Sequence, residues 1–307
     1  EARNIYIEKV LKFVDVKKLQ PLKILVNSGN GAAGPTFDAI ADRLEKLGSQ
    51  LEFSRYQHEP DQTFPNGIPN PLLTKNHTVT SDAVQAVGAD FGVAFDGDFD
   101  RCFFFDEFGN FIQGEYLVGI LAETFLERQA GAAIVHDPRV VWNTRAAVEA
   151  GRGVAVCAKV GHAYIKAAMR KREAVYGGEI SAHHYFRDFA YCDSGMIPWL
   201  MIAERLSVSG HTLSELISDG RVTFPSSGER NFTIEDPDTA IARVIDRFQF
   251  GATFDNTDGV SLEYADWRFN LRRSSTETLV RLNVEARGGK VDIEAKVSEI
   301  SALLTGI

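Results

Sequence analysis

The hydrophobic pattern in the first third of the chain alternates between short apolar runs and longer segments with helical periodicity. Runs of strand length occupy residues 22–27, 51–53, 91–95 and 102–105. Helical spacing covers residues 1–20, 37–47 and 81–88. The third of these helices is expected to begin at Ser81, a favourable N-cap residue. This alternation of strands and helices predicts an α/β layer that ends at about residue 110.

The rest of the chain continues this alternation and then changes character. Further helices are expected at residues 114–129, 144–150, 163–172, 194–208 and 237–248, and further strands at 132–136, 153–158 and up to Tyr176. In residues 260–264, 267–271 and 279–284, apolar and polar residues alternate singly, which is typical of a half-exposed antiparallel sheet. We therefore predict two consecutive α/β, three-layer domains with mixed sheets (1–110 and 111–222), followed by a smaller α+β domain with an antiparallel sheet (223–307).

Three aspartates alternate along the loop between the strands at 91–95 and 102–105. Asp96, Asp98 and Asp100 repel one another unless a cation lies among them, and their oxygens favour Mg²⁺ or Ca²⁺. A solvated Asp-Gly-Asp turn is the simpler alternative. An EF-hand is excluded, because Arg101 stands where that loop needs glycine and because strands flank the segment. The preferred interpretation is a site for one hard cation.

A glycine-rich turn, Gly29-Asn30-Gly31-Ala32-Ala33-Gly34, connects the first predicted strand to a helix. This GxGxxG arrangement occurs in dinucleotide-binding proteins, and Glu52 lies near the end of the next strand, where such proteins place a ribose-binding acid. An NAD-dependent oxidoreductase is therefore an alternative function. The same glycines also make an ordinary tight turn, with Pro35 suited to the first turn of the helix, and we prefer that interpretation.

Polar side chains with sugar-binding chemistry follow the strand that ends near Tyr176. Glu179, Ser181 and His183 alternate, so on an extended segment they would face the same way. Carboxylate, hydroxyl and imidazole groups together suit a polyol such as a sugar, although histidines satisfied by the backbone are the alternative. Zinc is disfavoured, because no additional histidine or cysteine lies at a matching spacing.

Two further loops carry cationic side chains. Lys159 and His162 follow the strand at 153–158, at the strand end where open α/β sheets bind ligands. Between the last two predicted strands lie Arg272, Arg273, Ser274, Ser275 and Thr276. Arginine and hydroxyl donors suit a phosphate dianion, and a solvated hairpin loop is an equal alternative.

Composition and charge exclude several other classes of protein. The net charge of -9 and the isoelectric point near 5.4 argue against a non-specific binder of nucleic acid or of a membrane surface. No apolar run is long enough to span a bilayer. Cys102, Cys157 and Cys192 form no closely spaced pair, which favours a cytoplasmic location.

Taken together, the motifs resemble domains two, three and four of the bacterial phosphomannomutases in the α-D-phosphohexomutase family. The segments that carry this resemblance, which covers the whole chain, are 29–34, 64–66, 96–101, 159–162, 178–183, 193–195 and 272–276. Each motif is weak alone, but their order and spacing are specific. The resemblance implies interconversion of mannose 6-phosphate and mannose 1-phosphate through a bisphosphorylated sugar, with glucose phosphates as the other candidate substrates.

The resemblance also implies a role for each candidate residue. The metal ligands, which would bind Mg²⁺, are Asp96, Asp98 and Asp100, and Arg101 would stand beside the transferring phosphoryl group. The sugar pocket would be lined by Glu179, Ser181, His183, Lys159, His162 and Arg139. The phosphate that is not reacting would be held by Arg272, Ser274, Ser275 and Thr276.

Some family features are changed or missing in this chain. Family members commonly have glycine at the position of Phe99, asparagine at that of Ser275 and proline at that of Thr278. Their phosphorylated serine lies in a Thr-Ala-Ser-His-Asn-Pro motif of a first domain, whereas no serine here precedes a histidine and the chain starts at Glu1. We therefore expect the first domain to be absent and to be a candidate partner. Alone, the chain is expected to bind Mg²⁺ weakly and to lack mutase activity, and an inactive sugar-phosphate-binding remnant is the remaining alternative.

Overall fold

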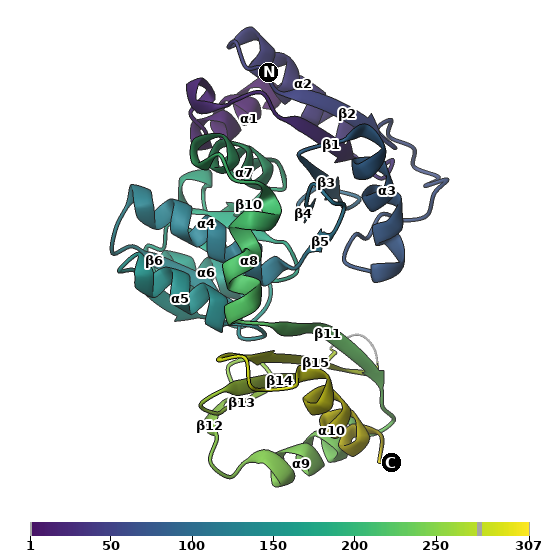
Figure 1. The fold of residues 1–307 in the computed structure, drawn as a ribbon, viewed down its shortest axis with the longest axis vertical. Coiled ribbons are helices and arrows are strands. Elements are labelled where there is room, and N and C mark those ends of the chain that lie inside the picture. The colour runs from purple at the N-terminus through teal and green to yellow at the C-terminus, as the bar shows by residue number, and fades with distance from the viewer. Residues whose placement is uncertain (1, 275–277, 307) are drawn as a thin grey trace.

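The computed structural model describes residues 2–274 and 278–306, so Ser275 and Thr276 of the predicted phosphate loop lie outside the described residues. Within these residues, three five-stranded sheets follow one another along the chain. Figure 1 shows the third sheet and its helices as a separate lower part, with the first two sheets above it. This order confirms the predicted fold class. None of the described helices has the length and apolar character that crossing a membrane requires.

The first sheet is mixed and has the order β2-β1-β3-β4-β5. Its strands are β1 (Lys23–Asn27), β2 (Glu52–Tyr56), β3 (Phe91–Phe95), β4 (Cys102–Phe105) and β5 (Phe111–Ile112). The helices of this region are α1 (Ala2–Val10), α2 (Gly34–Lys46) and α3 (His77–Val87), with the 3₁₀ helices η1 (Leu11–Phe13), η2 (Val16–Lys18) and η3 (Thr74–Asn76). β1 runs parallel to β2 and β3, whereas β4 is antiparallel to β3 and β5. The acidic loop therefore connects two strands, as predicted, and the structure shows that these strands are antiparallel neighbours.

Two helices in this region differ from their predicted bounds. The single helix expected over residues 1–20 is α1 followed by η1 and η2. α3 begins at His77, with Asn76 as its N-cap, so Ser81 lies inside the helix and the predicted cap is wrong. The reason is tertiary packing: the buried side chains of α3 are Thr80 and Val84, one turn apart, so its packed face starts before Ser81.

The second sheet is also mixed and has the order β10-β9-β8-β6-β7. Its strands are β6 (Ala133–His136), β7 (Val154–Cys157), β8 (Tyr176–Gly178), β9 (His184–Phe186) and β10 (Cys192–Asp193). The helices of this region are α4 (Gly114–Arg128), α5 (Trp142–Ala150), α6 (His162–Arg172), α7 (Met196–Ser209) and α8 (Leu213–Thr223), with η4 (Arg187–Phe189). β6 is parallel to β7 and β8, and β9 is antiparallel to β8 and β10. The pattern of apolar residues predicted β6, β7 and β8 but not the two short strands β9 and β10.

Helix α7 joins the first two sheets through a common hydrophobic core. Trp199 is fully buried, and its ring lies 5.2 Å from that of Phe37 in α2 and 5.9 Å from that of Phe53 in β2. The same core cluster includes buried residues of α4 and β6 from the second region. The helix predicted at residues 194–208 is therefore present as α7 and belongs to the hydrophobic core. It connects two regions that are separate in the sequence.

The third sheet is antiparallel throughout and has the order β11-β15-β14-β13-β12. Its strands are β11 (Ser226–Thr233), β12 (Thr253–Asp255), β13 (Val260–Glu263), β14 (Trp267–Arg273) and β15 (Leu279–Ala286). The helices α9 (Pro237–Phe248) and α10 (Ile293–Thr305) pack on its apolar face. Trp267, Phe269 and Leu271 of β14 lie in this core, which is separate from that of the upper part.

The polar face of the third sheet is buried at its centre, so the prediction of a half-exposed sheet is wrong there. Arg268 and Asn270 alternate with the apolar residues of β14, but they are only 2% and 0% exposed. Arg268 contacts the backbone that follows β6 in the second region. Alternation shows only that the two faces differ in chemistry, and a polar face can be buried against another part of the protein instead of water.

His136, the last residue of β6, is buried and makes stability depend on pH. Burial lowers the pKa of its imidazole to about 4, compared with about 6.5 in an unfolded chain. Its Nδ1 donates a hydrogen bond to the Asp137 carbonyl at 2.8 Å, so the neutral ring is satisfied. Because the unfolded state takes up this proton first, the stabilisation is complete above about pH 6.5 and decreases as the pH falls toward 4.

A His136→Asn variant tests this pH dependence. Between about pH 4 and 6.5, its free energy of unfolding is expected to change less steeply with pH than that of the wild type. The difference between the two slopes should be up to about 1.4 kcal/mol per pH unit. Urea titrations at several pH values measure both slopes. The exposed His211 provides the control, since His211→Asn should keep the wild-type slope. Equal slopes for His136→Asn and the wild type would contradict the assignment.

Candidate functional site

The acidic loop between β3 and β4 brings its three aspartates together. Asp96 follows β3 directly and is 2% exposed, whereas Asp100 is half-buried and Asp98 is exposed. One carboxylate oxygen from each lies within 4.8 Å of the other two. The structure therefore places the three predicted metal ligands at one point.

The charges of this loop suit a hard cation. Burial raises the pKa of Asp100 to about 6, and the charges of Asp96 and Asp98 contribute to the increase. The Oδ1 atom of Asp100 is buried and has no hydrogen-bond partner among the described residues. Asp96 is already paired, because Nε and Nη2 of Arg101 both lie 2.6 Å from its Oδ2. Three converging carboxylates with an unsatisfied oxygen form a donor set that fits Mg²⁺.

The glycine-rich turn supports the acidic loop. The Ala32 N–H donates to the Gly97 carbonyl at 2.9 Å, and any side chain at Gly31 would place its Cβ 2.7 Å from the same oxygen. The N–H groups of Gly29, Asn30 and Gly31 also donate hydrogen bonds within the protein. A dinucleotide pyrophosphate needs such donors free. The turn thus has the structural role preferred from the sequence, and its occupied donors argue against the NAD-dependent alternative.

Backbone contacts hold the acidic loop against the second sheet. Arg101 and His183 form an isolated antiparallel β-bridge. The Gly195 N–H donates to the Phe99 carbonyl at 3.1 Å, and a Cβ at Gly195 would lie 2.5 Å from that oxygen, so glycine is required there. Phe99 itself has a φ of 52°, a conformation that favours glycine, the residue common in the family at this position. These contacts therefore hold the acidic loop beside residues 183 and 195.

Residues 179–183 form a tight turn between β8 and β9, so the predicted extended segment is wrong. The Ala182 N–H donates to the Glu179 carbonyl at 3.0 Å, and Ala182 has a φ of 71°. The Glu179 N–H donates to the His183 carbonyl at 2.9 Å, which closes the hairpin. Because the chain reverses here, Glu179 and Ser181 lie near Arg139, whereas His183 faces the acidic loop.

Arg139 is a buried cation beside this turn. Its Nη2 lies 2.8 Å from Asp137 Oδ2, 3.2 Å from Ser181 Oγ and 3.7 Å from Glu179 Oε2. On the other side, its Nη1 lies 3.7 Å from Glu229 of β11. Burial alone would lower the pKa of Arg139, but Asp137 and the other carboxylates outweigh this effect and raise it. Arg139 thus remains charged and links the turn at residues 179–183 to the third sheet.

Four side chains from different segments meet beside the acidic loop: Asp100, His162, His183 and Asp193. The Nδ1 atoms of His162 and His183 lie 3.1 and 3.3 Å from Asp193 Oδ2. The Nδ1 of His183 also lies 3.7 Å from Asp100 Oδ2. Burial would raise the pKa of Asp193, but the adjacent His183 and Lys166 lower it to about 2. The structure therefore brings the two predicted histidines together around a carboxylate.

Arg272 of the third sheet is tied to the second region through Asp258. Arg272 Nη1 lies 3.6 Å from Asp258 Oδ2, which also accepts a hydrogen bond from the Val160 N–H at 3.1 Å. Burial lowers the pKa of Arg272, and the positive charge of Arg139 adds to this effect. The predicted phosphate-binding arginine and the predicted sugar-binding arginine are therefore electrostatic neighbours, and an anion between them would be favoured by both.

Two other predicted residues have different surroundings. Lys159 is exposed, and its Nζ lies 5.1 Å from the ring centroid of Tyr164. Within the described part of the chain, Lys159 has no polar contact with Glu179. Ser274 is buried, and its N–H donates to the Leu279 carbonyl at 2.8 Å, between β14 and β15. Ser274 therefore lies directly after β14, where that strand pairs with β15.

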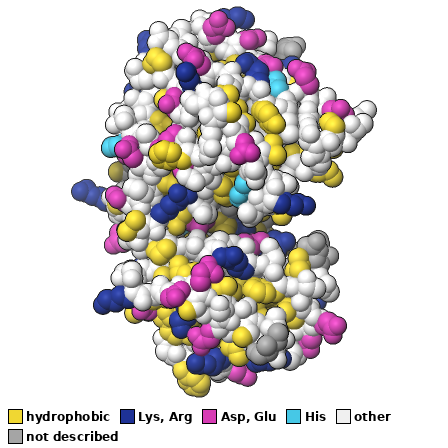
Figure 2. Space-filling view, turned by 45° about the vertical axis from the view of Figure 1, so that its right-hand side comes forward, with side chains coloured by type: hydrophobic (Ala, Val, Ile, Leu, Met, Phe, Trp, Pro, Cys, Tyr) yellow, Lys and Arg dark blue, Asp and Glu magenta, His cyan; other side chains and the backbone are white. Residues whose placement is uncertain are grey.

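The molecular surface is hollowed between the third sheet and the rest of the protein. Figure 2 shows this hollow between the lower and the upper parts, with basic side chains and a histidine beside it. Arg139 belongs to the upper part and Arg272 to the lower part. Both parts of the protein therefore border the hollow.

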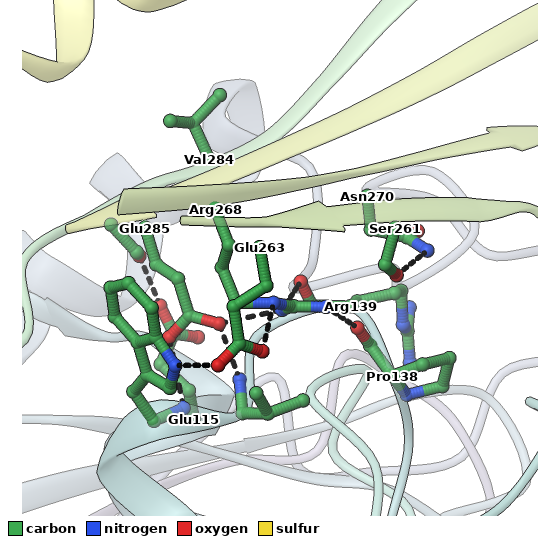
Figure 3. A network of polar contacts seen from close by, with 12 residues as sticks. Glu115, Pro138, Arg139, Ser261, Glu263, Arg268, Asn270, Val284 and Glu285 are labelled. Carbon is green, nitrogen blue, oxygen red and sulfur yellow. Dashed lines mark hydrogen bonds and ion pairs between the residues drawn. The ribbon is translucent and has the colours of Figure 1, made fainter. Parts of the chain in front are cut away.

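A buried ion pair holds the third sheet against the loop that carries Arg139 (Figure 3). Arg268 Nη1 lies 2.6 Å from Glu285 Oε1, and the guanidinium donates to the carbonyls of Pro138 and Arg139 at 2.9 and 3.1 Å. Glu285 also accepts hydrogen bonds of 2.7 and 3.0 Å from two backbone N–H groups at the start of α5, where the helix dipole favours a carboxylate. This ion pair positions the Arg139 loop from the third sheet.

Sequence reasoning missed several carboxylates that organise this site. They are Asp137, Glu229, Asp258 and Glu285, whereas Asp193 lay in a motif of the family resemblance but received no role there. Asp137 could have been found, because it follows β6 at the strand end where open α/β sheets bind ligands. The others carry no local signal, because their partners are distant in the sequence.

Comparisons with known proteins identify the class to which this fold and site belong. The family model described as phosphoglucomutase/phosphomannomutase, alpha/beta/alpha domain II, matches residues 4–109, and that for domain III matches residues 113–223. The chain belongs to the phosphoglucomutase/phosphomannomutase family. It is 57% identical over 303 residues to a phosphomannomutase of Salmonella montevideo, an alignment that covers 98% of this chain and 66% of that protein. The chain thus spans slightly less than two thirds of this relative.

Solved structures show the same fold. A phosphoglucomutase/phosphomannomutase family protein from Burkholderia thailandensis superposes with a TM-score of 0.83 at 27% identity, over 99% of this chain and 65% of that one. An N-acetylphosphoglucosamine mutase from Aspergillus fumigatus, solved with GlcNAc-6P and magnesium, has a TM-score of 0.71 at 15% identity, over 98% of this chain and 70% of that one. The second likeness concerns the fold alone.

Proposed function

We propose that this chain contributes the metal, sugar and phosphate sites of a phosphomannomutase. That enzyme would interconvert mannose 6-phosphate and mannose 1-phosphate by phosphoryl transfer through a sugar bisphosphate. The observation that carries this proposal is the proximity of three sequence-distant groups: the acidic loop, the turn beside Arg139, and Arg272. The high identity to a phosphomannomutase supports mannose phosphate over other hexose phosphates.

The acidic loop would serve phosphoryl transfer. Asp96, Asp98 and Asp100 would hold Mg²⁺, which, when bound, supplies positive charge close to the transferring phosphoryl group. Arg101, fixed by its bond to Asp96, would add a second positive charge at the same place. Phosphoryl transfer needs mainly positioning and charge neutralisation, and this loop offers both. The related fold solved with magnesium is consistent with this assignment.

The rest of the hollow would bind the two ends of the sugar phosphate. Glu179 Oε1 accepts a hydrogen bond from the Tyr185 hydroxyl at 2.7 Å, which fixes the carboxylate for sugar hydroxyls. The other sugar-binding residues would be Ser181, His183, His162, Lys159 and Arg139. The non-reacting phosphate would be held by Arg272, Ser274, Ser275 and Thr276.

We infer that the phosphorylated serine is supplied from outside these 307 residues, because no serine here precedes a histidine. The chain by itself is then expected to bind phosphorylated hexoses without interconverting them. ³¹P NMR of mannose 6-phosphate mixed with the chain and Mg²⁺ is expected to show no mannose 1-phosphate. Its appearance would overturn this part of the proposal. The cytoplasmic location remains a prediction from cysteine usage.

A titration of mannose 6-phosphate into the chain in the presence of Mg²⁺ tests the site. Measurable binding is expected, and Glu179→Gln should weaken it about tenfold or more, because a hydrogen bond to a charged group contributes about 1.5–3 kcal/mol. The exposed Glu173 provides the control, since Glu173→Gln should leave the affinity unchanged. Equal affinity for Glu179→Gln and the wild type would contradict the proposed sugar site, and saturation by NAD would favour the oxidoreductase alternative.

A further inference from the structure

We propose that Asp100, His162, His183 and Asp193 form a second metal site, which takes a transition-metal ion such as Zn²⁺. These residues come from the acidic loop, the start of α6, the end of the turn at residues 179–183 and β10. From the sequence, zinc was disfavoured because no ligands lie at a suitable spacing. The fold overrides that argument, because it brings the four side chains to within 4.8 Å of one another.

The distances in this cluster match those between the ligands of a tetrahedral ion. With bonds of about 2.0–2.1 Å to nitrogen and oxygen, two ligand atoms of tetrahedral Zn²⁺ are about 3.3–3.4 Å apart. From Asp193 Oδ2, the Nδ1 atoms of His162 and His183 lie at 3.1 and 3.3 Å. The distance from His183 Nδ1 to Asp100 Oδ2 is 3.7 Å. The remaining ligand atoms lie within 4.8 Å of one another.

The hydrogen bonding of the cluster is also compatible with a bound cation. His183 Nδ1 and Asp193 Oδ2 are buried and have no hydrogen-bond partner among the described residues, although they face each other. The other oxygen of Asp193 lies 3.1 Å from Lys166 Nζ, which leaves Oδ2 directed at the two imidazoles. A fixed outer contact of this kind orients a metal-binding carboxylate. The ordinary alternative is an imidazolium held between two carboxylates.

The donor set distinguishes this site from the magnesium loop. Two imidazole nitrogens suit zinc and related ions, whereas Mg²⁺ is held by oxygen ligands. Asp100 belongs to both sets, so an ion in the second site would withdraw one carboxylate from the loop. It would also occupy His162 and His183, which are assigned to the sugar. If the proposed function is correct, occupancy of this site is inhibitory, but the existence of the site does not depend on that function.

Cobalt spectroscopy tests the site without any measurement of activity. Co²⁺ added to the full chain in the presence of excess Mg²⁺ is expected to give the strong visible absorption of tetrahedral cobalt, which Zn²⁺ should abolish by displacement. His162→Gln and Asp193→Asn should each weaken Co²⁺ binding at least tenfold. His162 is half-exposed, so its variant is expected to fold, and circular dichroism verifies this.

Two control variants separate this site from other cobalt-binding positions. Asp98→Asn removes a carboxylate that belongs to the magnesium loop but not to the second site, and His211→Gln changes an exposed histidine elsewhere. Both are expected to keep the tetrahedral absorption and the wild-type affinity for Co²⁺. The proposal is overturned if the wild type gives no tetrahedral absorption, if His162→Gln binds Co²⁺ as the wild type does, or if either control variant removes the signal.

Discussion

Replacement of Arg268 by methionine is expected to lower the free energy of unfolding by about 3–5 kcal/mol. The side chains of Arg268 and Glu285 are only 2% and 1% exposed, so the substitution leaves a buried carboxylate without its partner. The carbonyls of Pro138 and Arg139 also lose their donor. Urea unfolding followed by circular dichroism measures the loss.

A matched control lies on the same strand. Arg273 pairs with Asp238, but their side chains are 59% and 78% exposed, so Arg273→Met should change stability by less than about 1 kcal/mol. The double variant Arg268→Met/Glu285→Met should recover part of the lost stability, because no unpaired buried charge remains. If Arg268→Met unfolds at the same urea concentration as the Arg273 control, the ion pair does not hold the third sheet as described.

Replacement of Trp199 by alanine is expected to cost about 3–5 kcal/mol, because the cavity would lie between the first two sheets. Trp199 is fully buried against Phe37 and Phe53, which belong to the other sheet region. Trp199→Phe is the control and should lose less than half as much. Its ring keeps part of the contacts, and the indole Nε1 has no hydrogen-bond partner among the described residues that could be lost. Equal unfolding midpoints for the alanine variant and the wild type would show that this helix does not join the two regions.

The sequence predicted best those elements whose cause is local. Strands β3 and β4 and helix α9 have the predicted bounds, because apolar runs, helical periodicity and Pro237 at a helix start act within a few residues. The acidic loop could be located for the same reason, since two clear strands border it. Its three aspartates converge as predicted, although their role in binding metal remains a prediction.

Predictions failed where distant parts of the chain determine the local structure. Ser81 has good capping chemistry, but α3 packs against the first sheet and already begins at His77, before Ser81. The turn at residues 179–183 depends on pairing between β8 and β9, so alternation of side chains gave the wrong geometry. Arg268 and Asn270 looked solvent-facing because their burial depends on the second region, not on their own strand.

By itself, the sequence determined the longer central strands and most of the helices, the fold class and the motifs that resemble the mutase family. These follow from short-range periodicity and from the order of motifs along one chain. Only the tertiary structure decided which charges meet: His162 and His183 around Asp193, Arg139 between Asp137 and Glu229, and Arg268 with Glu285. The physical reason is that electrostatic interaction depends on distance in space and on exclusion of water, and neither can be read from spacing along the chain.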